Sequence, residues 1–205
     1  MRLYASIYLF AYTLFVFVAI ALPYFGEDGI HFFEHNLSDL GAQQTTGNWA
    51  MNIAFMVMSL ATVVYGSYAL QQHWGHLLVL YFFTCAFGLT AVYQSAGVDT
   101  LLLYDYTHDS LHHLFSIIAG FGFMVLCISF FFKLTLTKHR VQTAIVFLIA
   151  ILLSLLQVQF SQYEGLFQRL LLLICFGWLF FAFTVYDFDK KKRQDKKRMK
   201  RYKNI

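Results

Sequence analysis

Apolar segments long enough to cross a lipid bilayer recur along the whole chain. The hydrocarbon core of a bilayer is about 30 Å thick, and a helix needs about twenty residues to cross it. Six such segments stand at residues 3–25, 49–70, 77–98, 113–132, 142–160 and 166–188. Backbone N–H and C=O groups in lipid need partners within the protein, so these segments must be helical. The sequence therefore predicts an all-α fold, a six-helix transmembrane bundle.

The composition excludes a soluble domain of the same length. Of the 205 residues, 59% are hydrophobic and only 13% are charged, whereas soluble domains carry about 25% charged residues. We expect one membrane domain, residues 1–188, and a basic tail, residues 189–205. The tail should be disordered or loosely helical and lie on anionic lipid of the inner leaflet. A nucleic-acid partner is not expected, because a basic tail directly after a span is more often a topology anchor.

Charge asymmetry predicts the orientation. Every Lys and Arg except Arg169 falls near the N-terminus, in the connection at 133–140, or in the tail. Basic residues concentrate on the cytoplasmic side of membrane proteins. We therefore expect a multi-pass protein of the cell membrane with both termini in the cytoplasm. The outer side then receives most of the acidic residues and histidines.

The stretch 105–113, Asp-Tyr-Thr-His-Asp-Ser-Leu-His-His, runs directly into the fourth predicted span. Helical spacing places His108 above His112, and Asp109 above both His112 and His113. Ionisable groups at the mouth of a span are costly to bury and are functional candidates by default. The outer end of this span is therefore the predicted functional site.

Residues 28–40 show a second helical pattern, with apolar residues on one side and polar residues on the other. His31, Glu34 and His35 share the polar side. The segment is too short to cross a membrane, so it predicts a short amphipathic helix at the outer surface between the first and second spans.

Polar residues also open the second and the last predicted spans. Asn48 and Asn52 lie one turn apart, and Gln168 precedes Arg169. We interpret all four as candidate substrate-binding residues, with hydrogen bonding between helices as the alternative for the two Asn. Arg169 is expected either to snorkel to lipid headgroups, to hold an anionic substrate group, or to pair with a carboxylate. The expected carboxylate partners are Asp39, Asp99, Asp109 and Glu164.

Two blocks of sequence resemble a known family. Leu37-Ser38-Asp39-Leu40-Gly41, followed by Asn48-Trp49-Ala50-Met51-Asn52 and a histidine pair opening the fourth span, is similar to the bacterial and archaeal membrane-protein family catalogued as domain of unknown function 998. This resemblance implies a multi-span bundle and no particular activity.

A more distant likeness is to the superfamily of alkaline ceramidases and progestin/adiponectin-type receptors. This resemblance implies a zinc site built from Ser, Asp and His. Ser38, Asp39 and the cluster at 108–113 are similar to it, but the late HxxxH of that superfamily is missing, since no histidine follows His139.

The first functional hypothesis is a metal-dependent hydrolase or transferase that acts on lipid at the outer leaflet. Zinc with three protein ligands and one open position makes water nucleophilic near neutral pH. The candidate ligands are His108, His112, His113, His31 and His35, and the candidate catalytic residues are Ser38, Asp39 and Asp109.

Other functions fit the same residues. A lipid-binding or transport protein would use the outer His and Asp groups for a headgroup or for protons. A b-type haem would need axial histidines on facing helices, which the positions of His73 and His76 disfavour. In a structural protein the same groups would form a polar cap on a bundle that works through protein partners. The sequence alone leaves open whether the protein is an enzyme.

Overall fold

The computed structural model describes residues 2–25, 30–97, 103–134 and 136–202, with side chains up to residue 185. Within these ranges the chain is helical and contains no strand. Six helices are long and apolar enough to cross a membrane. They are α1 (Arg2–Ala21), α3 (Asn48–Leu70), α4 (Trp74–Val92), α5 (Tyr106–Lys133), α6 (Thr137–Gln159) and α7 (Glu164–Tyr202). The predicted all-α architecture with six spans is confirmed.

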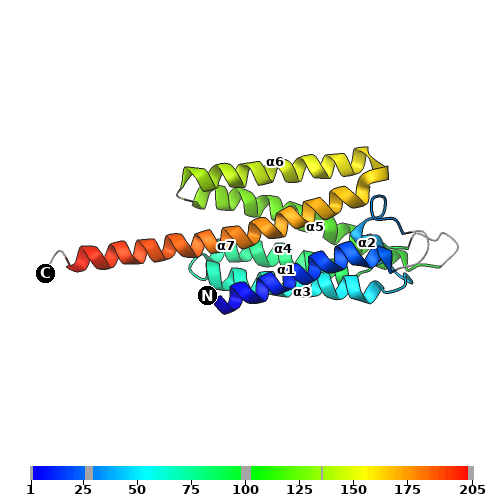
Figure 1. Ribbon diagram of the computed structural model, residues 1–205, viewed down its shortest axis with the longest axis horizontal. Helices are drawn as coiled ribbons and strands as arrows, with labels where there is room; N and C mark the ends of the chain where they lie inside the picture. Colours follow the sequence, from blue (N-terminus) through cyan, green and yellow to red (C-terminus); the bar gives the residue numbers. More distant parts are fainter. Residues whose placement is uncertain (1, 26–29, 98–102, 135, 203–205) are drawn as a thin grey trace.

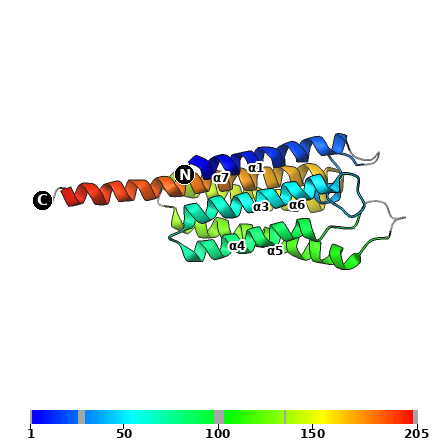
Figure 2. The ribbon, with the colours of Figure 1, turned by 90° about the horizontal axis from the view of Figure 1, so that it is seen from below.

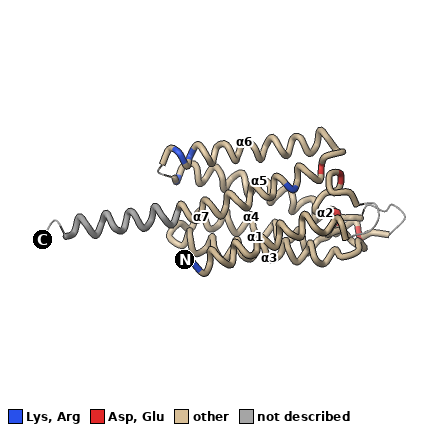
Figure 3. The backbone as a smooth tube through the Cα atoms, viewed as in Figure 1, with Lys and Arg blue, Asp and Glu red and all other residues tan. Residues whose placement is uncertain are grey.

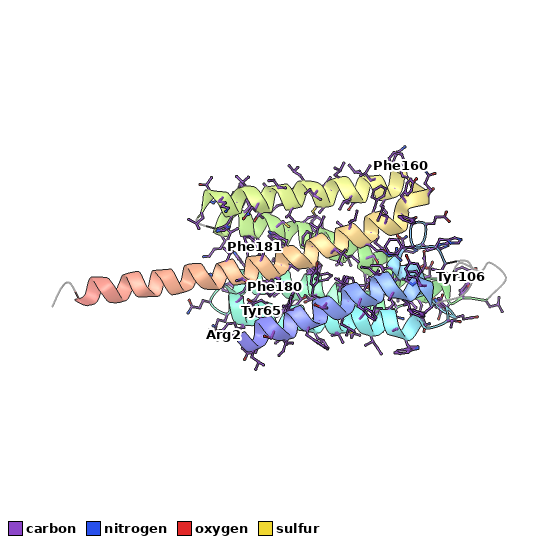
Figure 4. The ribbon with its side chains drawn as sticks, viewed as in Figure 1. Arg2, Tyr65, Tyr106, Phe160, Phe180 and Phe181 are labelled. Atoms are coloured by element: carbon purple, nitrogen blue, oxygen red, sulfur yellow. The ribbon has the colours of Figure 1, made fainter. Side chains whose placement is uncertain are left out.

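The bundle has two chemically different ends. α1 begins and α7 ends at the same end, and α7 runs on beyond the other helices (Figures 1 and 2). Arg2 lies at that end (Figure 4), as do the basic residues near the α5–α6 connection, while the described Asp and Glu residues gather at the opposite one (Figure 3). Tyr106 and Phe160 mark this opposite end in Figure 4. We call it the distal end; it comprises residues 30–48, 93–97, 103–113 and 157–169.

Four buried aromatic rings from four helices join the middle of the bundle. Phe15 of α1 contacts Phe55 of α3, Phe55 contacts Phe87 of α4, Phe87 contacts Phe176 of α7, and Phe176 returns to Phe15. Their ring centroids are 4.9–5.9 Å apart. Aromatic pairs in this range contribute about 0.5–1.5 kcal/mol each beyond their buried area. This closed ring fixes α1, α3, α4 and α7 relative to one another.

α5 is held closely to this core and α6 is not. A Cβ atom at Gly122 of α5 would lie 3.1 Å from the Cα atom of Phe83 in α4, so the absence of a side chain permits the close approach. α6 lies at the edge of the bundle beside α5 and α7 (Figure 1). It buries only Thr143, Ala150 and Leu153.

Several helices begin or end at residues other than those predicted. α4 ends at Val92 rather than at residue 98, and residues 98–102, with Asp99, lie outside the described residues. α5 starts earlier than residue 113, because Asp105 caps it by accepting hydrogen bonds from the backbone N–H groups of Thr107 (2.8 Å) and His108 (3.3 Å). The N–H groups of His108 and Thr107 also lower the pKa of the Asp105 carboxyl. α7 continues as one helix through Tyr202, into the residues predicted as the basic tail.

Candidate functional site

The segment between α1 and α3 lies at the distal end, but it is not the amphipathic helix predicted for residues 28–40. Asp28 lies outside the described residues, residues 31–35 form turns, and α2 (Leu37–Leu40) is a single helical turn. Asn36 starts this turn as its N-cap, and Asp39 Oδ2 accepts a hydrogen bond from the Asn36 N–H at 2.8 Å. The predicted helix was therefore too long, although Leu37 and Leu40, two of its apolar residues, are buried.

Arg169 of α7 explains why the chain before Asn36 does not continue the helix. Its Nη1 donates to the carbonyl oxygens of Phe32 and His35, each at 2.8 Å, and its Nε donates to Ala19 O at 3.1 Å. The guanidinium also stacks over the Phe32 ring, 4.5 Å from its centroid. Carbonyl groups that accept from Arg169 are held in place by α7 rather than by a helical ladder.

The prediction that Arg169 pairs with a carboxylate was wrong for Asp39, Asp109 and Glu164, whose side chains are described. Arg169 is 2% exposed and forms no ion pair there, and its Nη2 has no hydrogen-bond partner in that part of the chain. Asp39 acts on it only through longer-range electrostatic attraction. Arg169 is thus a buried cation satisfied mainly by backbone carbonyls, and its role is to hold α1 and the Phe32–His35 turn together.

The first turns of α7 hold the next residues of the segment. Glu164 accepts a hydrogen bond from the side-chain amide of Asn36, and Gln168 Oε1 accepts one from the Leu37 N–H. A Cβ atom at Gly165 would lie 2.1 Å from the carbonyl oxygen of His35. Only glycine permits the segment to approach α7 this closely.

α3 and the connection between α4 and α5 hold the rest of the segment through its backbone. The contacts are Asn52 Nδ2 to Gly41 O (2.9 Å), Asn48 Nδ2 to Ala42 O (2.9 Å), Ser95 Oγ to Ser38 O (3.0 Å) and Gln43 N to Ser95 O (2.9 Å). Asn48 and Asn52 therefore use their amides to fix the backbone of this segment. Ser38 lies in the middle of a segment that the bundle holds on both sides.

Ser38 and His112 form a hydrogen-bonded pair. Ser38 Oγ lies 3.0 Å from His112 Nε2, although the two residues are 74 positions apart in the sequence. His112 is 3% exposed, on the first turns of α5. Its Nδ1 lies 2.9 Å from Thr90 O and 2.8 Å from Tyr93 O, at the carboxyl end of α4.

The two carbonyl groups determine the tautomer of His112. A carbonyl oxygen only accepts hydrogen bonds, so Nδ1 must carry the proton. In the neutral ring, Nε2 then has a free lone pair, and the Ser38 hydroxyl donates to it. This is the arrangement of a serine nucleophile and its general base, in which a third group orients the base. Here backbone carbonyls of α4 take the place that a carboxylate has in a Ser-His-Asp triad.

Ser38 borders an apolar cavity of about 450 Å³ inside the bundle. Small-molecule pockets usually range over about 300–1,000 Å³. Most of the lining is apolar, from Phe55, Phe83, Phe87 and Phe123 on one side to Leu171, Leu172 and Cys175 of α7 on the other. The polar lining groups near the distal end are Ser38, Thr90, Gln157 and Gln168. The Ser38 hydroxyl thus lies at the edge of an apolar space.

The other predicted site residues do not join this pair. Asp39 faces Asn36, and burial raises the pKa of its carboxyl group. Asp109 accepts from the Ala96 N–H at 2.8 Å, and its Oδ1 lies 3.5 Å from Nε2 of the largely exposed His113. The His108 ring packs against Tyr93.

His31 and His35 contact each other on the turn before α2, where His35 Nδ1 accepts from the His31 N–H at 3.0 Å. Among the described residues, no group of three or more His, Cys, Asp or Glu side chains is placed to hold a metal ion. The His112 nitrogens already face Ser38 and the two α4 carbonyls. A zinc ion at the distal end stays a prediction.

The sequence placed Ser38 and His112 in one site and predicted that Ser38 hydrogen-bonds a metal ligand or the attacking water, but it did not single out His112 as the partner of Ser38. It also missed the structural residues that hold Ser38, namely Asn36, Gln43, Ser95 and Gln157. Asn36 could have been found, because Asn at 36 followed by Asp at 39 is a capping-box spacing. The others bond to distant backbone groups and leave no local signal.

Comparison with known proteins agrees with the first resemblance. The profile of a family described as a protein of unknown function, DUF998, matches residues 9–185, which include Ser38, His112 and the whole cavity lining. No curated protein and no solved structure matches the chain. The matched region covers most of the 205 residues. The chain therefore belongs to the DUF998 family of membrane proteins of unknown function, as the residues at 37–41 and 48–52 predicted.

Proposed function

We propose that this protein is a membrane hydrolase or acyltransferase that cleaves a carboxylic ester of a lipid, with Ser38 as the nucleophile and His112 as the general base. The observation that carries the proposal is the 3.0 Å hydrogen bond between Ser38 Oγ and His112 Nε2 at the edge of an apolar cavity. Nucleophile and base must lie within about 2.6–3.2 Å for proton transfer, and this pair does.

The reaction follows from the two side chains. Ser38 Oγ attacks the ester carbonyl carbon while Nε2 of His112 takes the hydroxyl proton. The bond from the carbonyl carbon to the alcohol oxygen then breaks, and the alcohol leaves with the proton from Nε2. Water cleaves the acyl-serine in a hydrolase, and a second alcohol or amine does so in a transferase. In both cases Ser38 regains its proton and the enzyme returns to its starting state.

The carboxyl end of α4 supports the charged form of His112. Proton transfer makes the ring an imidazolium, and its Nδ1–H points at the carbonyls of Thr90 and Tyr93. Unpaired carbonyls at a helix carboxyl end carry partial negative charge and stabilise a cation by up to about 2 kcal/mol in partly buried sites. These carbonyls therefore both orient the base and lower the free energy of its protonated state.

Gln168 is the candidate donor for the negative charge on the substrate oxygen. Its Oε1 accepts from the Leu37 N–H, next to Ser38, and its side chain lines the cavity. Because the oxygen faces Leu37, the NH₂ group is left to donate to the oxyanion. Removing one such donor from a hydrolase costs about 10²–10³ in kcat.

A long-chain alkyl fluorophosphonate, which forms a bond only with an activated serine, tests the proposal. Purified protein in lipid nanodiscs should be labelled at Ser38, as mapped by mass spectrometry of the peptides. Release of fatty acid from phospholipid should fall by about 10³-fold or more in Ser38→Ala and in His112→Ala.

Ser116 lines the same cavity without a described imidazole partner, so the reagent should not label it. Ser116→Ala is therefore the matched control, in which Ser38 should still be labelled. Each variant is first checked by its thermal unfolding, and Ser38→Thr keeps a hydroxyl in case Ser38→Ala fails to fold. Folded wild-type protein that is not labelled at Ser38, or a folded Ser38→Ala that still releases fatty acid, overturns the proposal.

We also infer that the chain lies in the cell membrane with both termini in the cytoplasm and Ser38 toward the outer leaflet. The support is the gathering of basic residues at the end where α1 begins (Figure 3). The basic residues after position 188 would then lie on anionic inner-leaflet lipid. A cysteine at Gln44 should react with an impermeant thiol reagent in intact cells, and one at Asn204 should not. Reversed labelling would contradict this orientation.

A further inference from the structure

The cavity beside Ser38 is polar at one end and apolar at the other. Ser38, Thr90, Gln157 and Gln168 lie at its distal end, whereas its inner wall includes Phe55, Phe83, Phe123 and Cys175. From Gln168 to Cys175 it follows α7 for seven residues, which is roughly 10 Å at the helical rise. That length is about a third of the hydrocarbon core of a bilayer. A polar head with an apolar body is the shape of an acyl ester.

The cavity opens sideways, between α5 and α6. Ile117 of α5 lines the cavity and is at the same time 71% exposed. Ser116 and Gly120 on α5 and Ser154 on α6 likewise both line the cavity and are exposed. A residue with both properties must lie at the mouth. Phe121 of α5 and Leu148 of α6, which are 68% and 62% exposed, show that the surrounding surface is apolar.

We propose that the cavity binds one acyl chain of a lipid ester, which enters from the surrounding leaflet between α5 and α6 and brings its ester group to Ser38. This inference rests on the proposed function and adds the binding site, the route and the part of the lipid that is held. A chain longer than the cavity leaves through the same opening, with its end in the bilayer.

How well an acyl chain fits the cavity should decide which lipid binds. A chain that moves from bilayer hydrocarbon into an apolar cavity gains little from the hydrophobic effect, because lipid tails are as apolar as Leu side chains. Close packing against the Phe rings and polar contacts at the ester then decide which chain binds. Side chains that narrow the cavity should therefore change the preferred chain length.

Gly120 offers a clean way to narrow it. A Cβ atom at Gly120 would meet no atom within 4 Å, so Gly120→Phe adds a ring at the mouth without displacing the backbone. Gly75, on the first turn of α4 at the other end of the bundle, has the same open space. Gly75→Phe is the matched control, since it adds the same ring far from the cavity.

Photo-cross-linking tests the binding site without requiring catalysis. The protein is reconstituted in phosphatidylethanolamine and phosphatidylglycerol vesicles that contain a trace of phosphatidylethanolamine with a mid-chain diazirine on one acyl chain. Cross-links, mapped by mass spectrometry, should concentrate in the wild type and in Ser38→Ala on the cavity-lining residues Ser116, Ala119, Phe123, Met124, Ala150 and Ser154. Gly120→Phe should lower their yield at least several-fold, and Gly75→Phe should not change it.

Two results would overturn the inference: cross-links spread evenly over outward-facing residues such as Phe121 and Leu148, or a cavity yield that Gly120→Phe leaves unchanged. The arms also separate the two proposals. Cross-links in the cavity without fatty-acid release or labelling at Ser38 support chain binding and reject the hydrolase. Fatty-acid release that depends on Ser38, without cross-links in the cavity, supports the hydrolase and rejects this binding site.

Discussion

Toward α4, the helix α5 packs so closely that a Cβ atom at Gly122 would lie 3.1 Å from the Cα atom of Phe83, whereas toward α6 a Cβ atom at Gly120 would meet no atom within 4 Å. The buried His112 contacts the carboxyl end of α4, and the exposed Ile117 borders the cavity mouth. One side of this helix therefore positions His112, the proposed base, and the other leaves open space beside Gly120.

The same contrast extends over the whole bundle. In α3, 56% of the most apolar part of the span is buried inside the protein, and in α6 only 11% is. Close packing restricts side chains to single rotamers and positions them accurately, which the Ser38–His112 pair needs. Loose packing at α6 lowers the cost of opening a path to the cavity. We therefore assign stability to the packed side, α1, α3, α4 and α7, and access to the α6 side.

The largest expected effect on stability comes from a substitution that weakens the packed side at the distal end. Arg169→Met removes the donors to Ala19, Phe32 and His35 and leaves these carbonyls without that partner. Buried acceptors without partners cost about 1–3 kcal/mol each, partly offset because the buried charge is also removed. We expect a loss of roughly 2–4 kcal/mol in the free energy of unfolding, measured by thermal unfolding in detergent.

The matched change for Arg169 is Arg169→Lys, which keeps the charge but cannot bond three carbonyls from one planar group. It should fall between the wild type and Arg169→Met. An unfolding temperature of Arg169→Met equal to that of the wild type would contradict the structural role of this side chain.

The next largest effect comes from a substitution that disrupts the contact between α4 and α5. Gly122→Leu places a side chain against the backbone of Phe83 and forces the two helices apart. Overpacking of this kind costs about 1–3 kcal/mol. Because His112 is on the same helix, the variant should also lose ester cleavage beyond its loss of stability, as measured on the folded fraction. Full activity in a destabilised Gly122→Leu would show that close packing of α5 against α4 is not needed to position His112.

Gly120→Leu sharpens the comparison, because it changes the other side of the same helix. Leu is a better helix former than Gly, and the space beside Gly120 is open, so we expect the free energy of unfolding to change by less than about 1 kcal/mol, toward stabilisation. Thermal unfolding measured alongside Gly122→Leu checks this. Equal destabilisation by the two substitutions would mean that α5 is packed alike on both sides.

The smallest expected effect is the pH dependence of Asp39→Asn. Burial raises the pKa of the Asp39 carboxyl, so the folded state binds this proton more readily than the unfolded state. The contribution of Asp39 to stability is therefore least favourable above the raised pKa and improves as the pH falls through it. Asn keeps an oxygen acceptor for the Asn36 N–H and carries no charge.

Asp39→Asn should thus be slightly more stable than the wild type at neutral pH, by less than about 1 kcal/mol, and the difference should shrink toward acid pH. Unfolding temperatures of both proteins between pH 7 and pH 4 measure it. Ester cleavage should persist in Asp39→Asn, since Asp39 faces Asn36 and not the Ser38–His112 pair. Loss of cleavage in a folded variant would return Asp39 to the catalytic role that the sequence predicted.

The sequence by itself determined the six spans, the polar distal end and the family, because these depend on local properties. Apolar length fixes what lies in lipid, and ionisable residues in 105–113 fix which end is polar. His112 was a predicted site residue because it belongs to this ionisable stretch, and Ser38 because of the family resemblance. Helical periodicity also placed His112 on one face of its helix, but it does not say which neighbour that face meets.

Only the tertiary structure decided that His112 meets Ser38 and the carbonyls of Thr90 and Tyr93. It also decided that Arg169 meets backbone carbonyls and, among the described side chains, no carboxylate. Backbone carbonyls are the same in every residue type, so no sequence pattern marks the ones that are left unpaired at a helix end or a turn. The cavity has the same origin: it exists because α6 packs loosely beside α5, and a void leaves no signal in the residues that surround it.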